Sequence, residues 1–189
     1  MKSRLLHPSF ARFLAALVAA GIGICWTGCA TALGGVAEGS TTQSAAIGPV
    51  TGRVLTRADV RQQTATLYFG DETYAEVNSR WLERFYPEFR AELFRLGVVR
   101  WDARFDCNRF AEFYTSFAQA RFYREMFQSR IAAQALAMSP FWYVRADGKG
   151  AHAIVQALTE RGRMFIDPQT GREVQLTPIE SATAYYRFF

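Results

Sequence analysis

The apolar residues between positions 73 and 96 recur at intervals of three and four. This spacing is typical of a helix with one buried face, and its members are Tyr74, Val77, Trp81, Leu82, Phe85, Phe89 and Leu93. Proline lacks the N–H that a helix interior needs, and its ring clashes with the preceding turn. Pro87 therefore predicts a break, with two helices at 73–85 and 87–96 and with Gly97 as the stop.

A second helical pattern begins near Cys107. Its apolar positions have the spacing i, i+3, i+4 and i+7 and predict a helix over 107–120 with an aromatic core face. These positions are Phe110, Phe113, Tyr114 and Phe117. Asp106 is a suitable N-cap, which places Cys107 in the first turn. A further helix is expected over 121–138. Upstream, one or two short strands are expected within 53–70, where residues 61–69 end in a β-prone run.

From Pro140 onward the apolar period shortens to two or less. Four short strands are expected, at 141–144, 151–158, 163–167 and 173–176. Tight turns rich in Gly, Pro and Asp separate them, which predicts an antiparallel sheet. The expected fold class is therefore α+β, with N-terminal helices packed on a C-terminal antiparallel sheet.

The start of the chain has the layout of a secretory signal peptide. Three basic residues precede 14 apolar residues, and small residues follow. The apolar run is too short for a comfortable membrane span. The next segment is rich in Gly, Ser, Thr and Ala, as flexible tethers are. The chain then divides into a signal peptide, a flexible linker and a folded domain, at 1–29, 30–52 and 53–189.

Two cleavage patterns compete at the end of the signal peptide. Gly28-Cys29-Ala30 resembles a bacterial lipobox, in which Cys29 is lipidated and anchors the protein to the membrane. Ala30-Thr31-Ala32 is instead an ordinary A-x-A cleavage site. Both patterns predict an exported protein, either lipid-anchored in the bacterial cell envelope or released into the periplasm or outside the cell.

Removal of the signal peptide changes the charge and the cysteine balance. The whole chain has 22 basic and 17 acidic residues; without the three basic residues at its start, 19 basic residues remain and the formal charge falls from +5 to +2. There is no basic stripe interleaved with aromatic residues, so nucleic acid is not an expected partner. Cys25 and Cys29 belong to the signal peptide, which leaves Cys107 alone in the domain. A lone cysteine in an exported protein indicates an intermolecular disulfide or a reactive thiol.

Three residues in order along the domain suit nucleophilic chemistry. Cys107 lies at a predicted helix start, where the helix dipole favours a thiolate. His152 lies on one predicted strand and Asp167 at the end of the next. A turn at 160–162 makes residues whose numbers sum to about 320 oppose each other, and His152 and Asp167 sum to 319. We therefore expect the imidazole and the carboxylate to be cross-strand neighbours, about 5 Å apart.

The stretches FDCNRFA, GAHAIVQAL and MFIDPQTG, taken together, resemble the papain-like cysteine protease superfamily. The resemblance is strongest to its transglutaminase-like branch, the bacterial transglutaminase-like cysteine peptidase type, and covers about 100–176. It implies that Cys107 attacks an amide, that His152 shuttles the proton and that Asp167 orients His152. It also implies a protein or peptide substrate, including cell-wall peptide, and leaves hydrolysis and acyl transfer both open.

Other residues and roles complete this picture. Trp101 and Gln156 are further candidates for substrate or oxyanion contact, although Trp101 lies only six residues before Cys107 and also suits the core. Cys107 also fits a small buried hydrophobe, and Asp167 before Pro-Gln-Thr-Gly also fits a turn-initiating residue. One histidine and one usable cysteine are a poor ligand set, so we expect no metal and no cofactor.

Two functional hypotheses follow. The first is an exported, cysteine-dependent amide hydrolase or acyl transferase with a Cys-His-Asp triad. The second is a non-catalytic binding or interaction module on the same fold, because folds keep their shape while functions change. The position of the Cys107 thiol relative to His152 distinguishes the two.

Overall fold

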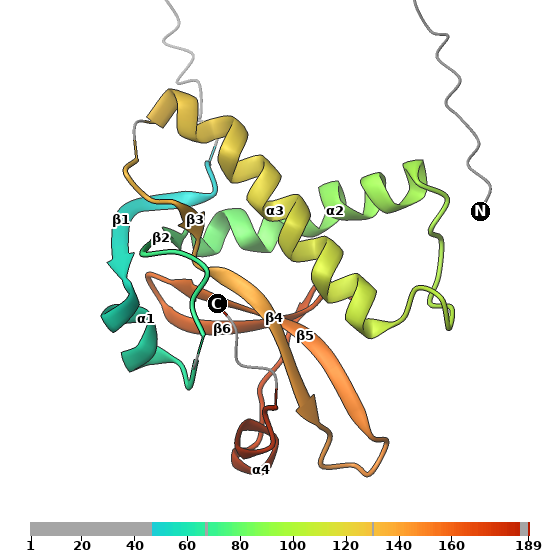
Figure 1. Cartoon of the computed structure of the whole chain (residues 1–189). Helices are drawn as coiled ribbons and strands as arrows, with labels where there is room; N and C mark the ends of the chain where they lie inside the picture. Colours follow the sequence, from blue (N-terminus) through green and yellow to red (C-terminus); the bar gives the residue numbers. More distant parts are fainter. Residues whose placement is uncertain (1–46, 67, 130, 186–188) are drawn as a thin grey trace, which may run out of the picture. The chain divides into compact units, whose positions relative to one another are not determined.

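A computed structural model describes residues 47–66, 68–129, 131–185 and 189. Its centre is a sheet of seven strands (Figure 1). The strands are β1 (Val50–Thr56), β2 (Thr73–Val77), β3 (Ala135–Leu136), β4 (Met138–Val144), β5 (Ala151–Thr159), β6 (Gly162–Asp167) and β7 (Arg172–Glu173). The helices are α1 (Arg57–Gln63), α2 (Ser79–Arg95), α3 (Cys107–Ser129) and α4 (Pro178–Ala182).

The sheet is mixed. Its strands follow the order β1-β2-β5-β6-β7, with β3 paired to β2 and β4 paired to β5. β2 runs parallel to both β3 and β5, and the other pairs are antiparallel. The predicted fold class, helices packed on a C-terminal antiparallel sheet, is therefore wrong. Two strands precede the helices α2 and α3 and join the same sheet through parallel pairs, which local periodicity does not reveal.

The two faces of the sheet carry different cores. Along β5, Ala153, Val155 and Ala157 point into the main hydrophobic cluster, which α2 and α3 also enter. Ile154 faces the other way and packs with Phe141 in a smaller cluster. Figure 1 shows α2 and α3 on one side of the sheet and the short α4 on the other. The alternation of side chains along β5 thus places the two hydrophobic clusters on opposite faces of the sheet.

The region predicted as two helices at 73–85 and 87–96 is a strand followed by one helix. Tyr74 to Val77 are buried on both faces of β2, so apolar residues there fit a strand as well as a helix. Asn78 caps α2 through its side-chain oxygen. The helix then continues through Pro87 to Arg95, and Gly97 follows its end with φ of 78°. The Gly97 stop is confirmed, whereas the break at Pro87 is wrong.

α3 is also longer than expected. The predicted helices at 107–120 and 121–138 form one helix from Cys107 to Ser129, and β3 and β4 begin within the second range. No proline or glycine interrupts the helix, and Phe110, Tyr114 and Phe122 continue its buried face. The start of this helix at Cys107 was predicted correctly because the Asp106 cap is a local signal.

Of the one or two short strands expected within 53–70, β1 confirms a part, since it extends to Thr56, whereas α1 follows it and reaches into the start of the β-prone run at 61–69. Thr56 and Asp59 form a capping box, in which each side chain accepts from the other residue's backbone N–H. This signal starts a helix at Arg57. By contrast, the strands predicted at 141–144, 151–158 and 163–167 are confirmed as β4, β5 and β6. Of the range 173–176, only Glu173 lies in a strand, β7.

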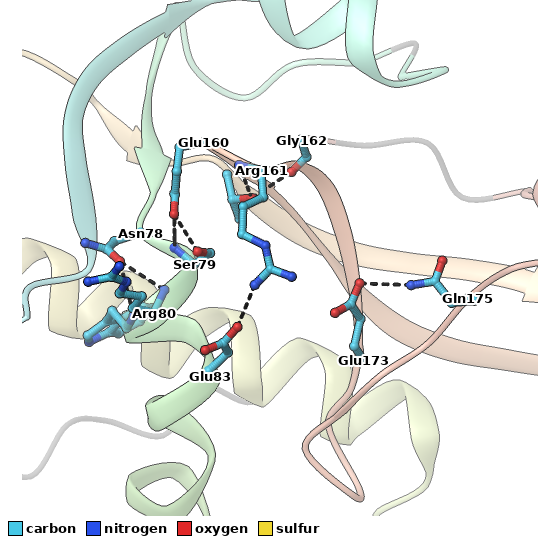
Figure 2. Close-up of polar contacts among 11 residues, drawn as sticks. Asn78, Ser79, Arg80, Glu83, Glu160, Arg161, Gly162, Glu173 and Gln175 are labelled. Carbon is cyan, nitrogen blue, oxygen red and sulfur yellow. Dashed lines mark hydrogen bonds and ion pairs between the residues drawn. The ribbon is translucent and has the colours of Figure 1, made fainter.

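A polar cluster joins the start of α2 to the β5–β6 turn. Figure 2 shows Glu160 at the first residue of α2, where its carboxylate accepts from the Ser79 N–H at 3.1 Å and from the Ser79 hydroxyl. Arg161 reaches along the helix to Glu83 at 2.6 Å. A carboxylate at a helix N-terminus meets unpaired N–H groups, so Glu160 acts as a cap from a distant part of the chain.

The described chain begins just before β1, so Val50 to Gly52 of the predicted linker lie in a strand. The predicted signal peptide, Cys29 and both cleavage sites lie outside the described residues, and export and lipidation stay predictions. None of the helices among the described residues is both long and apolar enough to cross a membrane.

Candidate functional site

Cys107 is the first residue of α3. Asp106 precedes it and accepts from the backbone N–H groups of Asn108 and Arg109 at 3.1 and 3.3 Å, as an N-cap does. The Cys107 side chain is half-buried and its sulfur lies 3.9 Å from Asn108 Oδ1. The predicted cap and the first-turn position of the thiol are therefore confirmed.

The surroundings of Cys107 are aromatic. Its side chain packs against the main hydrophobic cluster, on the α3 side of the sheet. Tyr185 lies close by, since burial and then the negative charge of an ionised Cys107 raise the pKa of the Tyr185 hydroxyl. The Tyr185 ring meets Trp142 edge-on at 5.9 Å, and its N–H donates to the Trp142 carbonyl at 3.1 Å. The thiol thus neighbours the chain segment that follows α4.

His152 lies near the start of β5, with the Tyr143 ring edge-on at 5.9 Å. Partial burial lowers the pKa of its imidazole, and the nearby Asp167 carboxylate opposes this shift. The β5–β6 register pairs Val155 with Ile166, so Asp167 lies diagonal to His152 on the same face. The prediction that these two residues are cross-strand neighbours is confirmed, although the register sets Asp167 opposite Ile154, two residues along β5 from His152.

Asp167 is also held by the turn that it begins. Its carboxylate accepts from the Gln169 N–H at 2.9 Å and from the Thr170 hydroxyl at 3.1 Å. The turn continues to Gly171, whose φ of 71° brings its backbone against the Tyr86 ring of α2. A side chain at that position would collide with the ring, so the turn needs glycine there. Asp167 therefore shapes the β6–β7 turn as well as facing His152.

The three predicted triad residues do not form one cluster. His152 shares its face of β5 with Ile154 and Gln156, away from α3. Cys107 packs on the α3 side. Within the described part of the chain, no hydrogen bond joins the Cys107 thiol to His152. The structure thus brings His152 and Asp167 together and places Cys107 beside Tyr185; the catalytic roles of all three stay predictions.

Gln156 and Trp101 occupy contrasting places. Gln156 is 2% exposed and its amide donates to the Ser139 hydroxyl at 2.9 Å. Trp101, in contrast, is 56% exposed on the loop between α2 and α3. The alternative that Trp101 belongs to the core is therefore wrong, and its exposed ring is free to meet a ligand.

Residues of the loop that carries Trp101 line an open hollow of about 390 Å³, and Trp101 is not among the lining residues. Its lining combines polar and apolar groups, from Gly97, Val98, Val99, Arg100, Asp102, Arg104 and Phe105. Hydrogen bonds fix the loop: Asp102 and Phe105 exchange backbone bonds at 2.9 and 3.3 Å. Arg104 holds both carboxylate oxygens of Asp102, at 2.8 and 3.3 Å, and this pairing lowers the pKa of Asp102. The hollow is thus formed before any ligand arrives.

Sequence reasoning missed this hollow. It considered Trp101 only as a core residue or in relation to Cys107. The signal was present in Arg100-Trp101-Asp102, where a large aromatic residue stands between opposite charges on a loop after a helix stop. Trp101 does not continue the helical spacing of the apolar residues before it, which indicates an exposed position.

Comparison with known proteins gives a fold but no family. No protein-family model matches the chain, and no curated protein matches it. One similar solved structure is the Polyporus squamosus lectin bound to the human-type influenza-binding epitope Neu5Acα2-6Galβ1-4GlcNAc, with 20% identity and a TM-score of 0.52. The chain shares its fold with this lectin. The match covers 72% of this chain and 49% of the lectin chain, so the chain spans about half of the lectin's length.

A second similar structure, described as a PSL1a–E64 complex, is also 20% identical, with a TM-score of 0.49 and coverage of 71% of this chain and 50% of the other. The solved structure that shares the fold with a TM-score above 0.5 is a lectin chain, and not a papain-like or transglutaminase-like protease. The family resemblance inferred from the three stretches is therefore corrected, and with it the expectation of a cysteine peptidase or hydrolase.

Proposed function

We propose that this chain is a non-catalytic binding module whose ligand is a carbohydrate. The shared fold with the Polyporus squamosus lectin supports a ligand of this class rather than nucleic acid or a peptide substrate. The even mixture of basic and acidic residues in the domain also argues against nucleic acid, which selects for a basic face. The match covers half of the lectin chain, so the site has to be argued from this chain's own residues.

The observation that carries the proposal is the 97–105 loop, whose residues line the 390 Å³ hollow and which also carries the exposed Trp101 ring, although Trp101 is not itself among the lining residues. A sugar ring presents one face of C–H groups, which packs on an aromatic ring, and a rim of hydroxyls. Arg100 and Asp102 flank Trp101 in sequence and line the hollow, where they can donate to and accept from those hydroxyls. An apolar platform beside a few placed polar groups is what small-ligand sites generally offer.

The rigidity of the loop contributes to affinity. Ordering a loop on binding costs about 0.5–1.5 kcal/mol for each immobilised side chain. The bidentate Arg104–Asp102 pair and the backbone bonds between Asp102 and Phe105 hold the loop in place beforehand. The loop therefore loses little conformational entropy when a sugar binds, which strengthens the binding of a ligand that makes only a few contacts.

The test is a titration of the folded protein with two sugars, Neu5Acα2-6Galβ1-4GlcNAc and Galβ1-4GlcNAc. Calorimetry gives the affinity, and amide NMR shifts locate the contact. We expect shifts at residues 97–105 and at least a ten-fold weaker affinity in Trp101→Ala, because the ring supplies the apolar platform. Tyr68→Ala is the matched control, since Tyr68 is a similarly exposed aromatic residue elsewhere.

Two outcomes would contradict the proposal: no binding of either sugar at millimolar concentration, or equal affinity in Trp101→Ala and the unmodified protein. The non-catalytic part has its own test. Cys107→Ala should bind the sugars with unchanged affinity, because Cys107 is not among the residues that line the hollow. Loss of sugar binding in Cys107→Ala would place the thiol inside the binding site.

A further inference from the structure

A small cavity opens on the opposite face of the sheet from α3. It holds about 30 Å³, room for a carboxylate group or two water molecules and little more. Its lining comes from the segment after α1, from β4, β5 and β6, and from the end of α4, through Ala65, Thr66, Phe141, Gln156, Arg163, Ser181 and Ala184. It is separate from the hollow beside Trp101, with which it shares no residue.

Arg163 is the charged group of this cavity. Its guanidinium lies over the rings of Phe141 and Phe165, at 5.1 and 4.4 Å from their centres. These rings fix the group in place through cation–π contact. Among the described residues, no carboxylate forms an ion pair with Arg163, and its Nε–H is buried without a partner. Burial lowers the pKa of this side chain, as expected for a cation without a counter-charge.

A second unpaired group lines the same cavity. Gln156 lies diagonal to Arg163 across the β5–β6 pair, with Leu158 opposite Arg163. Its amide nitrogen donates to Ser139, while its Oε1 is buried without a partner among the described residues. The Thr66 hydroxyl, bonded to Thr64 at 2.7 Å, adds a third polar group. A buried polar atom without a hydrogen bond costs roughly 1–3 kcal/mol. A ligand that bonds to both Arg163 Nε–H and Gln156 Oε1 would therefore bind favourably.

We infer that this cavity is a binding site for a small carboxylate, with Arg163 as its cationic anchor. A carboxylate oxygen accepts from the buried Nε–H in a charge-assisted hydrogen bond. A hydroxyl on the neighbouring carbon donates to Gln156 Oε1. The preferred ligand class is therefore a small α-hydroxycarboxylate, of which glycolate is the simplest. Phosphate has as many non-hydrogen atoms as glycolate, so a comparison of the two anions separates recognition of a carboxylate from general anion binding.

The experiment uses side-chain NMR of the folded protein, in which the arginine Nε–H groups give separate signals. Sodium glycolate, sodium acetate and sodium phosphate are each titrated against sodium chloride at matched ionic strength. We expect the Arg163 signal to shift to saturation with glycolate and less tightly with acetate, and tighter saturation with phosphate than with glycolate would overturn the carboxylate assignment. A response that is equal for chloride and glycolate, or one that never saturates, would overturn the proposal.

Two variants make the test specific. Gln156→Glu places a carboxylate inside the cavity, where it pairs with Arg163, so we expect glycolate binding to weaken at least ten-fold while the protein stays folded. Arg161→Gln is the matched control, because Arg161 is an exposed arginine on the adjacent turn whose ion partner is Glu83. Its glycolate affinity should equal that of the unmodified protein. Undiminished glycolate binding in Gln156→Glu would show that the ligand lies elsewhere.

Discussion

At the scale of single residues, the environment of His152 depends on opposing influences. Partial burial favours the neutral imidazole, and the Asp167 carboxylate favours the charged one. Burial is the stronger of the two, so the imidazole pKa lies below its ordinary value of 6.5. Arg145 also disfavours the charged form, and Asp147 favours it. The residue predicted as a catalytic base is thus a half-buried side chain whose neutral form is stabilised by folding.

This balance predicts a loss of stability on acidification. The folded pKa of His152 is lowered, so between that pKa and 6.5 the unfolded chain binds more protons than the folded one. The stability contributed by His152 is therefore complete above pH 6.5 and is lost as the pH falls through this window. The free energy of unfolding, measured with urea, should fall between pH 7.5 and 5.5. In His152→Gln it should depend less on pH over this range.

Asp167→Asn is the companion variant for this measurement. It keeps an oxygen for the Gln169 N–H but removes the charge that raises the pKa of His152. The folded pKa then falls further, and the decline between pH 7.5 and 5.5 should become steeper. The carboxyl groups with lowered pKa values, such as Asp59 and Glu180, titrate below this range. Equal slopes in all three proteins would contradict the assignment.

At the scale of elements, packing overrules local propensity in α2. Trp81, Phe85, Phe89 and Leu93 keep one buried face on both sides of Pro87. Burial of large side chains contributes about 1.5–3 kcal/mol each, which is enough to hold both halves in one helix although Pro87 offers no N–H to the Glu83 carbonyl. The break predicted at Pro87 is wrong because the cost of a proline inside the helix is smaller than the stabilisation from the buried face that both halves of α2 share.

Replacement of this proline should stabilise the protein. Pro87 is exposed in the helix interior, so Pro87→Ala restores a hydrogen bond without disturbing the core. Proline costs about 3 kcal/mol relative to alanine at such a position, while the stiffness it gives the unfolded chain offsets about 0.4–1 kcal/mol. We expect a net gain of about 2 kcal/mol in urea unfolding. Arg84→Ala, at an exposed position one turn earlier, should change stability by less than about 0.5 kcal/mol, and an unchanged or lower stability in Pro87→Ala would contradict the account.

At the scale of the whole molecule, local signals were predictable and long-range pairings were not. The Asp106 cap, the Gly97 stop and the hairpins of β4, β5 and β6 each depend on a few neighbouring residues. The parallel pairing of β2 with β3 and β5 joins residues about 60 to 80 positions apart, as Tyr74 with Ala135 and Val77 with Thr159, and no short motif encodes it. For the same reason, sequence order brought His152 and Asp167 together correctly but did not reveal that Cys107 packs on the other side of the sheet.

The end of the described chain closes this long-range core. Phe189 is 5% exposed and meets the Tyr74 ring edge-on at 5.5 Å. Its carbonyl accepts from the Tyr74 hydroxyl at 3.0 Å and from the Gly70 N–H at 2.8 Å, and its own N–H donates to Tyr68 at 2.9 Å. Phe189 is therefore a core residue, while Tyr185 is exposed and residues 186–188 lie outside the described ones.

Phe189→Ala should consequently lower the stability of the entire domain. Removal of a buried phenylalanine costs about 3–5 kcal/mol through lost burial and the cavity left behind, and we expect a loss in this range. The backbone hydrogen bonds remain available in this variant, so the loss measures packing alone. Phe94→Ala is the control, since Phe94 is 56% exposed and its removal should cost less than about 0.5 kcal/mol. Urea unfolding of both variants decides the matter: a loss below about 1 kcal/mol in Phe189→Ala would mean that the core closes without this residue.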